Sequence, residues 1–340
     1  LSYLAHANTH TRTHTHTHAH THTHTNTHTH THTHTHTHTH THTLTHFDRK
    51  KQEPCEIRVS DFNDANYLLF VAPDSPSVIE LHVGLRDWDN LKANGGSEIL
   101  SRNFPGCEIS PQEGFNLALK IDSGNLPRGP WGATGEACAT QLSEIKPMLM
   151  GAPLTLACQA LANGSNPQGG VIKVSMKAPT DCGGGDMYIV GKKDSVVVIF
   201  SVDFQDETDK AICKVLLQEF VEAQRSVNSA PSCDYKRGSE PPMELSDIPG
   251  IENTPDIAGF ISFKLFKDHV KTPEKLKNSV SALVGFNVYQ TYHLKATKTY
   301  MHMRMRHKSA ELLKVLNRAV QTGEEKKEKK TFSGKTFTRS

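Results

Sequence analysis

The sequence of 340 residues has few of the features that mark membrane proteins and secreted proteins. Aromatic residues make up only 7% of it. Its longest apolar stretch, residues 147–162, contains Pro153 and is shorter than the ~20 residues that a transmembrane helix needs. The chain does not open on a charged segment followed by an apolar one, so the sequence predicts no secretory signal. We therefore expect a soluble, cytoplasmic protein without membrane insertion.

Cysteine pairs with metal-binding or redox spacing are also missing. The seven cysteines are odd in number and contain no C-x-x-C pair, which argues against a zinc site and against a disulfide framework. Reduced, buried thiols are the expected state in an intracellular protein. These residues are Cys55, Cys107, Cys138, Cys158, Cys182, Cys213 and Cys233.

Motifs of catalysis and cofactor binding are absent or incomplete. There is no G-x-S-x-G elbow and no H-E-x-x-H pair, and no cysteine has a setting that implies a nucleophile. The stretch "SGKT" at 333–336 imitates the end of a phosphate-binding loop, but Lys329 stands where that loop requires a glycine. The sequence therefore predicts neither an enzyme nor a bound cofactor.

The first 48 residues are dominated by a Thr-His repeat. They hold 17 of the 22 histidines and almost no apolar side chain, so they cannot bury a core and are predicted to be disordered. Three interpretations stay open. The repeat could bind metal through histidines on one face of an extended strand. It could be an expanded repeat without a function. It could also be a gene-model artefact, because a CA dinucleotide repeat encodes Thr-His in one frame.

The rest of the sequence predicts two similar modules with antiparallel sheets, which is an α+β fold. Short β-rich runs such as "NYLLFVA" and "VIELHV" are separated by turn signals, and "ETDKAICKVLLQEFVEAQRS" has the period of an amphipathic helix. One alternating run should place Phe115, Leu117, Leu119 and Ile121 on one face. We expect a first module at 49–166, a second at 167–270, a long helix at 271–322 and a basic tail at 323–340.

The final helix has a well-marked beginning. Thr272 can cap it, Pro273 suits the first helical position, and Glu274 favours the positive end of the helix dipole. Gly285 weakens the pattern, but a continuous helix from Pro273 to Val320 would span roughly 72 Å. One small domain cannot cover that length, so part of the helix should contact another surface.

The stretch "YMHMRMRHKSAELLKVLNRA" places two kinds of side chain on separate arcs of that helix. One arc is apolar, and we expect it to pack against a partner helix. It contains Met301, Met305, Leu312, Leu316 and Ala319. The other contains Arg304, His307, Glu311, Lys314 and Arg318. A soft-metal site is the alternative, but methionines two residues apart diverge on a helix, so packing is favoured.

Basic charge gathers at the end of the chain. Residues 300–340 hold 11 Lys and Arg against 4 Glu, a local charge of +7, whereas the whole chain carries +2 and the remainder therefore −5. Nucleic-acid binding is one hypothesis, but no reading module is present and Glu311 interrupts the basic arc. We therefore favour an acidic protein surface. Phe332 and Phe337 could anchor the tail in pockets of a neighbour.

Several stretches are similar to one known family. They are "YHLKATKTYMHMRMRHKSAELLKVLNRA", "EKKEKKTFSGKTFTRS", "KKDSVVVIFSVDFQDETDKAICKVLLQEFVEAQRS", "EPPMEL" and "GFISFKLFKDHV". The chain resembles subunit 2, the large scaffold subunit, of the actin-related protein 2/3 complex. The resemblance implies a non-enzymatic cytoskeletal scaffold for actin nucleation and branching. Its long helix would pack antiparallel against a helix of subunit 4 and form part of the footing on an existing actin filament. The basic residues expected at such contacts are Arg304, Lys308, Lys314 and Arg318.

Overall fold

The computed structural model describes most of the chain after the repeat. The described residues are 53–61, 65–130, 132, 134–165, 170–176, 185–227, 229–249, 251, 257–319, 329–330 and 336–337. They belong to two units, Leu1–Lys295 and Ala296–Ser340. The Thr-His repeat and Cys182 lie outside the described residues.

The first sheet has five antiparallel strands in the order β1-β2-β3-β5-β4. Its first three strands are neighbours in the sequence, whereas the chain crosses through helices before it adds β4 and β5. Apolar residues alternate along β5, so that Leu117, Leu119 and Ile121 are all buried. The strands are β1 (Cys55–Asp61), β2 (Ala65–Val71), β3 (Val78–Gly84), β4 (Glu108–Ile109) and β5 (Leu117–Asp122).

The second sheet repeats this arrangement in the order β6-β7-β8-β10-β9. Here too the fifth strand along the chain lies beside the third and the fourth lies at the edge. The predicted fold class, α+β with two similar antiparallel sheets, is therefore confirmed. The strands are β6 (Val171–Ser175), β7 (Asp186–Lys192), β8 (Ser195–Val202), β9 (Ser232–Lys236) and β10 (Gly259–Phe266).

Helices follow the strands in the same places in both halves. After the third strand come α3 (Trp88–Leu91), η2 (Lys92–Gly96) and α4 (Ser97–Asn103) in the first half, and α8 (Glu207–Arg225) in the second. After the fifth strand come α5 (Gly135–Ser143), α6 (Ile145–Met150) and α7 (Ala152–Ala162), and then α9 (Lys267–Val270), α10 (Pro273–Val284) and α11 (Phe286–Ala319). The repeated order of strands and helices supports a duplicated design.

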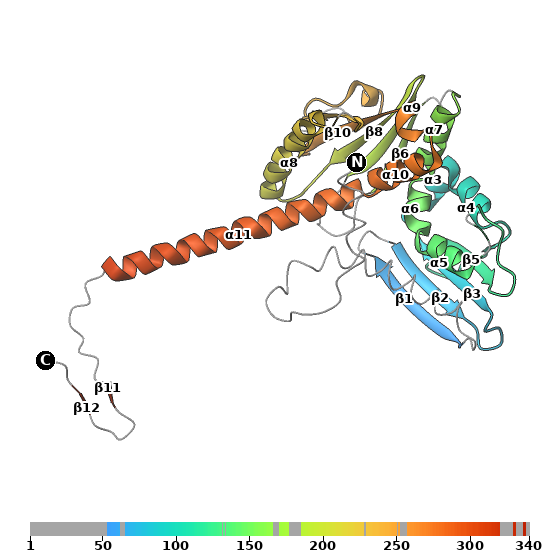
Figure 1. Ribbon diagram of the computed structural model, residues 1–340, viewed down its shortest axis with the longest axis horizontal. Coiled ribbons are helices and arrows are strands. Elements are labelled where there is room, and N and C mark those ends of the chain that lie inside the picture. Colours follow the sequence, from blue (N-terminus) through green and yellow to red (C-terminus); the bar gives the residue numbers. More distant parts are fainter. Residues whose placement is uncertain are drawn as a thin grey trace. The chain divides into compact units, whose positions relative to one another are not determined.

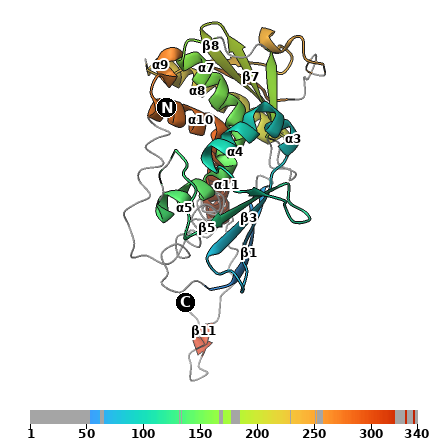
Figure 2. The ribbon, with the colours of Figure 1, turned by 90° about the vertical axis from the view of Figure 1, so that its right-hand side faces the viewer.

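One hydrophobic core joins the two sheets. Helices α6, α7 and α10 lie between them (Figures 1 and 2), and α10 packs against both α6 and α7. Leu81 of β3, Leu149 of α6 and Val198 of β8 are all fully buried members of a single cluster. A smaller cluster covers the opposite face of the second sheet and includes Tyr188, Ile199 and Leu245. Because the main core is continuous, the two sheets form one unit.

A buried ion pair ties the edge strand β1 to α6. Lys146 Nζ contacts Asp61 Oδ2, and the two side chains are 7% and 4% exposed. A charge removed from water to this degree is tolerated only when it is paired. Lys146 therefore helps to keep the end of β1 against the helical layer.

The C-terminal helices begin as the sequence predicts. Thr272 Oγ1 accepts a hydrogen bond from the Lys275 backbone N–H at 3.2 Å, and Pro273 occupies the first turn. The expected single helix is divided, however, because α10 ends at Val284 and α11 starts at Phe286. Gly285 lies between them, and a side chain there would come within 3.2 Å of the Ser281 carbonyl oxygen.

Several elements differ from the sequence-based expectation. Strand β9 was not predicted, because "SCDYK" has few apolar residues, and its pairing with β10 makes it a strand. The stretch "LRDWDNLKAN" at 85–94 has a helical period, but it runs into the π-helix η2, in which Asn94 and Gly95 leave helical geometry. Phe115 was expected on the same strand face as Leu117, but it precedes β5 and its ring lies 5.9 Å from that of His82.

Three histidines make stability depend on pH. Burial lowers the pKa of His82, His269 and His293 below 6.5. The unfolded chain therefore binds more protons than the folded chain below pH 6.5, so the free energy of unfolding should fall as the pH falls through that value. Urea unfolding at pH 7.5 and 5.5 measures this change.

His82→Gln is the matched variant for this prediction. His82 Nδ1 accepts a hydrogen bond from the Gln112 backbone N–H at 3.2 Å, and a glutamine oxygen can accept that bond without titrating. The loss of stability between pH 7.5 and 5.5 should therefore be smaller in His82→Gln. An equal loss in both proteins would contradict this role of His82.

Candidate partner-binding helix

The second half of α11 exposes an unusual amount of apolar surface. Every side chain from Tyr300 to Arg318 is exposed. Among the described residues, most of the exposed large apolar side chains lie in this segment and are between 44% and 62% exposed. They are Tyr300, Met301, Met303, Met305, Leu312, Leu313, Val315 and Leu316. Exposed apolar surface of this extent marks an interaction site.

Four of these side chains form one line, which we call the apolar seam: Met301, Met305, Leu312 and Leu316. At 3.6 residues per turn they fall within about 60° of one another around the helix axis. Leu313 lies about 90° from the centre of the seam and Met303 about 170°. The predicted fifth member, Ala319, is the last residue of α11, and its side chain lies outside the described ones.

The same half of α11 carries many basic side chains outside the seam. Lys308 and Arg304 lie about 50° and 90° from its centre, whereas Arg318 and Lys314 lie about 130° and 170° from it. Residues 296–319 contain six Lys and Arg and one Glu, a net charge of +5. Arg304 lies against the ring of Tyr300 at 5.7 Å, and Lys308 donates a hydrogen bond to Glu311 at 3.0 Å. No ion pair joins Lys314 or Arg318 to another residue that the structure describes. This surface should favour an acidic partner.

The first turns of α11 are fixed to the second sheet by aromatic packing. The Phe286 ring lies 5.0 Å from the rings of Phe200 and Phe263 and 5.7 Å from that of Phe220. One turn later, Gln290 Nε2 donates to Cys213 Sγ at 2.9 Å, and burial raises the pKa of that thiol to about 12. The helix therefore starts from a rigid base.

These four phenylalanines were not singled out from the sequence. They come from β8, α8, β10 and α11, so only the tertiary fold brings them together. A strand-and-helix pattern of apolar residues predicts that each is buried but not which of them meet.

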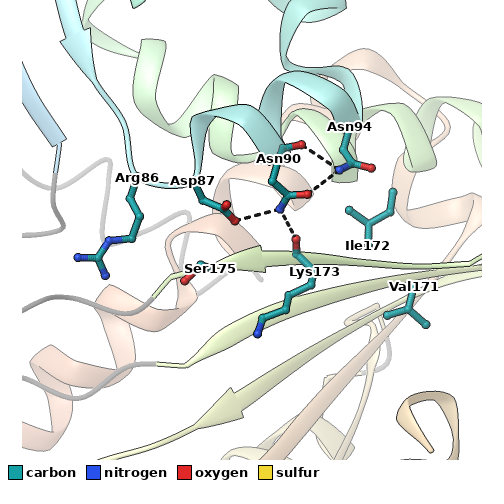
Figure 3. A pocket seen from close by; sticks show the side chains of 8 residues that line it. All are labelled: Arg86, Asp87, Asn90, Asn94, Val171, Ile172, Lys173 and Ser175. Carbon is teal, nitrogen blue, oxygen red and sulfur yellow. Dashed lines mark hydrogen bonds between the residues drawn. The ribbon is translucent and has the colours of Figure 1, made fainter. Parts of the chain in front are cut away.

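A polar pocket of about 650 Å³ lies between α3–η2 and the edge strand β6 (Figure 3). Asn90 Nδ2 donates to Asp87 Oδ2 at 2.9 Å and to the Lys173 carbonyl at 2.7 Å. Asn94 Nδ2 in turn donates to Asn90 Oδ1 at 2.8 Å. The Asn90 amide therefore covers part of the open edge of the second sheet, which protects it from pairing with another chain.

The pocket was not predicted from the sequence, although the sequence around it contains a pattern that favours irregular backbone. Asp87 is the one non-glycine residue with positive φ in the described backbone, at 57°, and "NGG" at 94–96 interrupts the helical pattern. Asx and glycine residues favour such departures from helical geometry. Asn90 and Asn94 form hydrogen bonds with other lining residues. The residues that line the pocket include no nucleophile with an adjacent base.

Three further expectations from the sequence concern metal sites, membrane-spanning helices and cysteine thiols. Among the described residues, no group of three or more His, Cys, Asp or Glu side chains is placed to hold a metal ion. Within the same residues, no helix is long and apolar enough to cross a membrane. The cysteines with described positions are all free thiols, and Cys107, Cys138, Cys158 and Cys213 are buried.

The chain is similar in sequence to known proteins over most of its length. Residues 81–323 match the family described as "Arp2/3 complex, 34 kD subunit p34-Arc". The chain belongs to the p34-Arc family. The match begins in β3 and continues beyond the end of α11, so it includes the second sheet and the apolar seam. The resemblance seen in the sequence is therefore confirmed.

Two curated relatives show how much of the chain is shared. "Actin-related protein 2/3 complex subunit 2" of Dictyostelium discoideum is 29% identical over 283 residues, which cover 82% of this chain and 89% of that relative. The protein of the same name from Schizosaccharomyces pombe is 29% identical over 302 residues, which cover 83% of this chain and 90% of that relative. Both similarities extend over nearly the whole relative.

The tail of this p34-Arc family member is described only in part. β11 (Lys329–Lys330) pairs with β12 (Thr336–Phe337) in a short antiparallel hairpin. Phe337 lies in β12, but its side chain is not among the described ones, and Phe332 lies outside the described residues. Their predicted role as anchors therefore stays a prediction.

Proposed function

We propose that this chain is a structural scaffold subunit of an actin-related protein 2/3 complex and that it performs no catalysis itself. Membership of the p34-Arc family and the names of its curated relatives support this role. The scaffold would place other subunits for actin nucleation and for branching of filaments. Such a role places the protein in the cytoplasm, at the actin cytoskeleton.

The observation that carries the proposal is the exposed apolar seam. Met301, Met305, Leu312 and Leu316 are between 44% and 62% exposed and share one side of a regular helix. Burying such a row against a second helix is the standard way to stabilise two long helices in water. We propose that the partner is a long helix of subunit 4, packed antiparallel along the seam.

Co-expression tests this pairing. The chain alone should self-associate or precipitate through the seam, and it should become monodisperse when it is co-expressed with subunit 4. Size-exclusion chromatography with light scattering distinguishes the two states. A stable monomer that does not bind subunit 4 would contradict the proposal.

Four basic side chains of α11 that lie outside the seam are proposed to contact an actin filament or neighbouring subunits. The candidates are Arg304, Lys308, Lys314 and Arg318. Lys308 already bonds to Glu311 at 3.0 Å, whereas Lys314 and Arg318 have no ion pair with another described residue. The second pair should therefore contribute more to a contact with an acidic surface.

Charge reversal at those two positions should weaken filament binding. In the assembled complex, Lys314→Glu with Arg318→Glu should raise the Kd for actin filaments about tenfold, because attraction to an acidic surface becomes repulsion. Co-sedimentation at 50 and 200 mM salt measures the Kd and its salt dependence. Arg225→Glu on α8 is the control, since Arg225 is exposed and pairs locally with Glu222. Equal weakening by both variants would contradict a role specific to this helix.

A further inference from the structure

The outer face of the first sheet, which points away from the main core, carries a small buried patch. It consists of Leu68, His82 and Ala118, which lie side by side because Leu68 of β2 pairs with His82 of β3 and His82 pairs with Ala118 of β5. All three are at most 1% exposed, yet neither Leu68 nor Ala118 belongs to the main hydrophobic core. Another segment of the chain therefore covers this face.

The loop between β4 and β5 lies over this patch, and we call its residues 110–115 the flap. The Phe115 ring lies 5.9 Å from the His82 ring. A side chain at Gly84, the next residue on the same face of β3, would come within 3.4 Å of the Gly114 carbonyl oxygen. Residues 110–114 are exposed and Phe115 is half-buried. The flap is therefore a thin cover between the patch and water.

The two ends of the flap are fixed to the sheet, and its centre is held by a histidine. Before the flap, β4 pairs with β5. After it, the Asn116 backbone N–H donates to the Val83 carbonyl at 3.1 Å, and the Asn116 side chain bonds to the backbone N–H and carbonyl of Leu85. Between these ends, the Gln112 backbone N–H donates to His82 Nδ1 at 3.2 Å.

His82 can accept this hydrogen bond only while its imidazole is neutral. Because Nδ1 is the acceptor, the proton of the neutral ring is on Nε2. Nε2 is buried and has no hydrogen-bond partner among the described residues. A second proton, on Nδ1, would turn two donors toward each other, so the bond from Gln112 to His82 would be lost.

The charged groups around His82 do not compensate for its burial. The nearest is Glu80 on β3, whose Oε2 lies 3.7 Å from Nε2, and Lys120 of β5 already lies 3.6 Å from the other carboxylate oxygen. The neighbouring strand β2 presents the apolar Leu68, and Glu113 of the flap is exposed. Burial therefore lowers the pKa of His82, and the attraction of Glu80 opposes this only in part.

We propose that protonation of His82 releases the flap and uncovers the patch while the two sheets stay folded. In the open form, water solvates the imidazolium, so His82 binds a proton more readily than in the closed form. The closed form is therefore fully favoured above about pH 6.5 and loses that advantage as the pH falls below this value. This acid-sensitive opening is local, unlike unfolding of the chain, and it does not depend on a role at actin.

Hydrogen exchange resolved to single amides in the full chain tests the release. The protection of the Gln112 amide, corrected for the intrinsic exchange rate, should fall about five- to tenfold between pH 7.5 and 5.5. The amides of Asn116 and Lys120 donate to the carbonyls of Val83 and Cys107, outside the flap. Their protection should change by less than about twofold, because only the flap opens. Unchanged protection of Gln112, or an equal loss at all three amides, would overturn the inference.

Two histidine variants assign the opening to His82. His82→Gln keeps an acceptor but does not titrate, so the Gln112 amide should be equally protected at both pH values. His269→Gln is the matched control, because His269 Nδ1 accepts the same kind of bond, from the Phe266 backbone N–H at 2.9 Å, beside the second sheet. It should keep the fall seen in the parent. A fall in His82→Gln as large as in the parent would contradict the proposal.

A measurement on the parent chain decides the question if His82→Gln does not fold. Exchange of the imidazole C2 hydrogen, followed by mass spectrometry, gives the pKa of His82. The proposal requires a pKa below 6.5. A value at or above 6.5 would mean that protonation favours the closed flap, and the inference would then be wrong.

Discussion

Leu312→Asp is expected to weaken binding of the subunit 4 helix by more than about 100-fold. Burial of a leucine contributes roughly 1.5–3 kcal/mol, and each 1.4 kcal/mol is a factor of ten in Kd. An aspartate at the same place would in addition bury a carboxylate without a partner, which costs more. Isothermal titration or biolayer interferometry with purified subunit 4 measures the change.

Leu313→Asp is the matched control. Leu312 and Leu313 are both 60% exposed and adjacent on α11, so the two variants have the same composition and change the same kind of surface. Leu313 lies outside the seam, so its replacement should weaken the pairing less than about tenfold. If Leu313→Asp had the same effect as Leu312→Asp, the partner would not follow the seam.

Lys146→Met is expected to cost about 3–5 kcal/mol of folding free energy, because it leaves the buried Asp61 carboxylate without its lysine. Globular domains have only about 5–15 kcal/mol in total, so a large part of the stability would be lost. Equilibrium urea denaturation, followed by circular dichroism, gives the difference directly.

The paired variant separates the charge from the packing. Lys146→Met together with Asp61→Leu replaces both charged groups by apolar ones, and such replacements are often neutral or stabilising. Most of the lost stability should therefore return. If the double variant were as unstable as the single one, loss of the lysine from the buried Asp61 carboxylate would not be the cause.

Much of the fold could be predicted because local patterns agree with the tertiary structure. The run "SVVVIFSV" forms β8. Its side chains from Val196 to Phe200 are all buried, so both faces of the strand are covered. Thr272 and Pro273 mark the start of α10 where the sequence places it. Such caps and apolar runs depend on neighbouring residues and on burial, which a sequence shows directly.

The remaining features depend on partners that are distant in sequence. β9 forms because Cys233 pairs with Phe263 of β10, 30 positions later. Asp61 and Lys146 are 85 positions apart, so their ion pair has no local signature. The break between α10 and α11 at Gly285 was harder still to predict, because one glycine in a helical pattern is often tolerated. Only the packing of both helices decides whether the helix is interrupted there.

The arrangement of side chains along α11 could be predicted in part, whereas their role as a binding site stays a prediction. The wheel pattern of residues 301–316 indicated an apolar line, and the structure shows that these side chains are exposed. The pattern says nothing of the rigid aromatic base at Phe286.

Oxidative footprinting of three methionines tests the central claim most directly. Met301 and Met305 belong to the seam, and Met303 lies nearly opposite; all three are between 44% and 62% exposed. When the chain is assembled with subunit 4, hydroxyl radicals should oxidise Met301 and Met305 several-fold more slowly than in the chain alone, and Met303 at nearly the same rate. Unchanged oxidation of Met301 and Met305, or protection of Met303 alone, would contradict a helix lying along this seam.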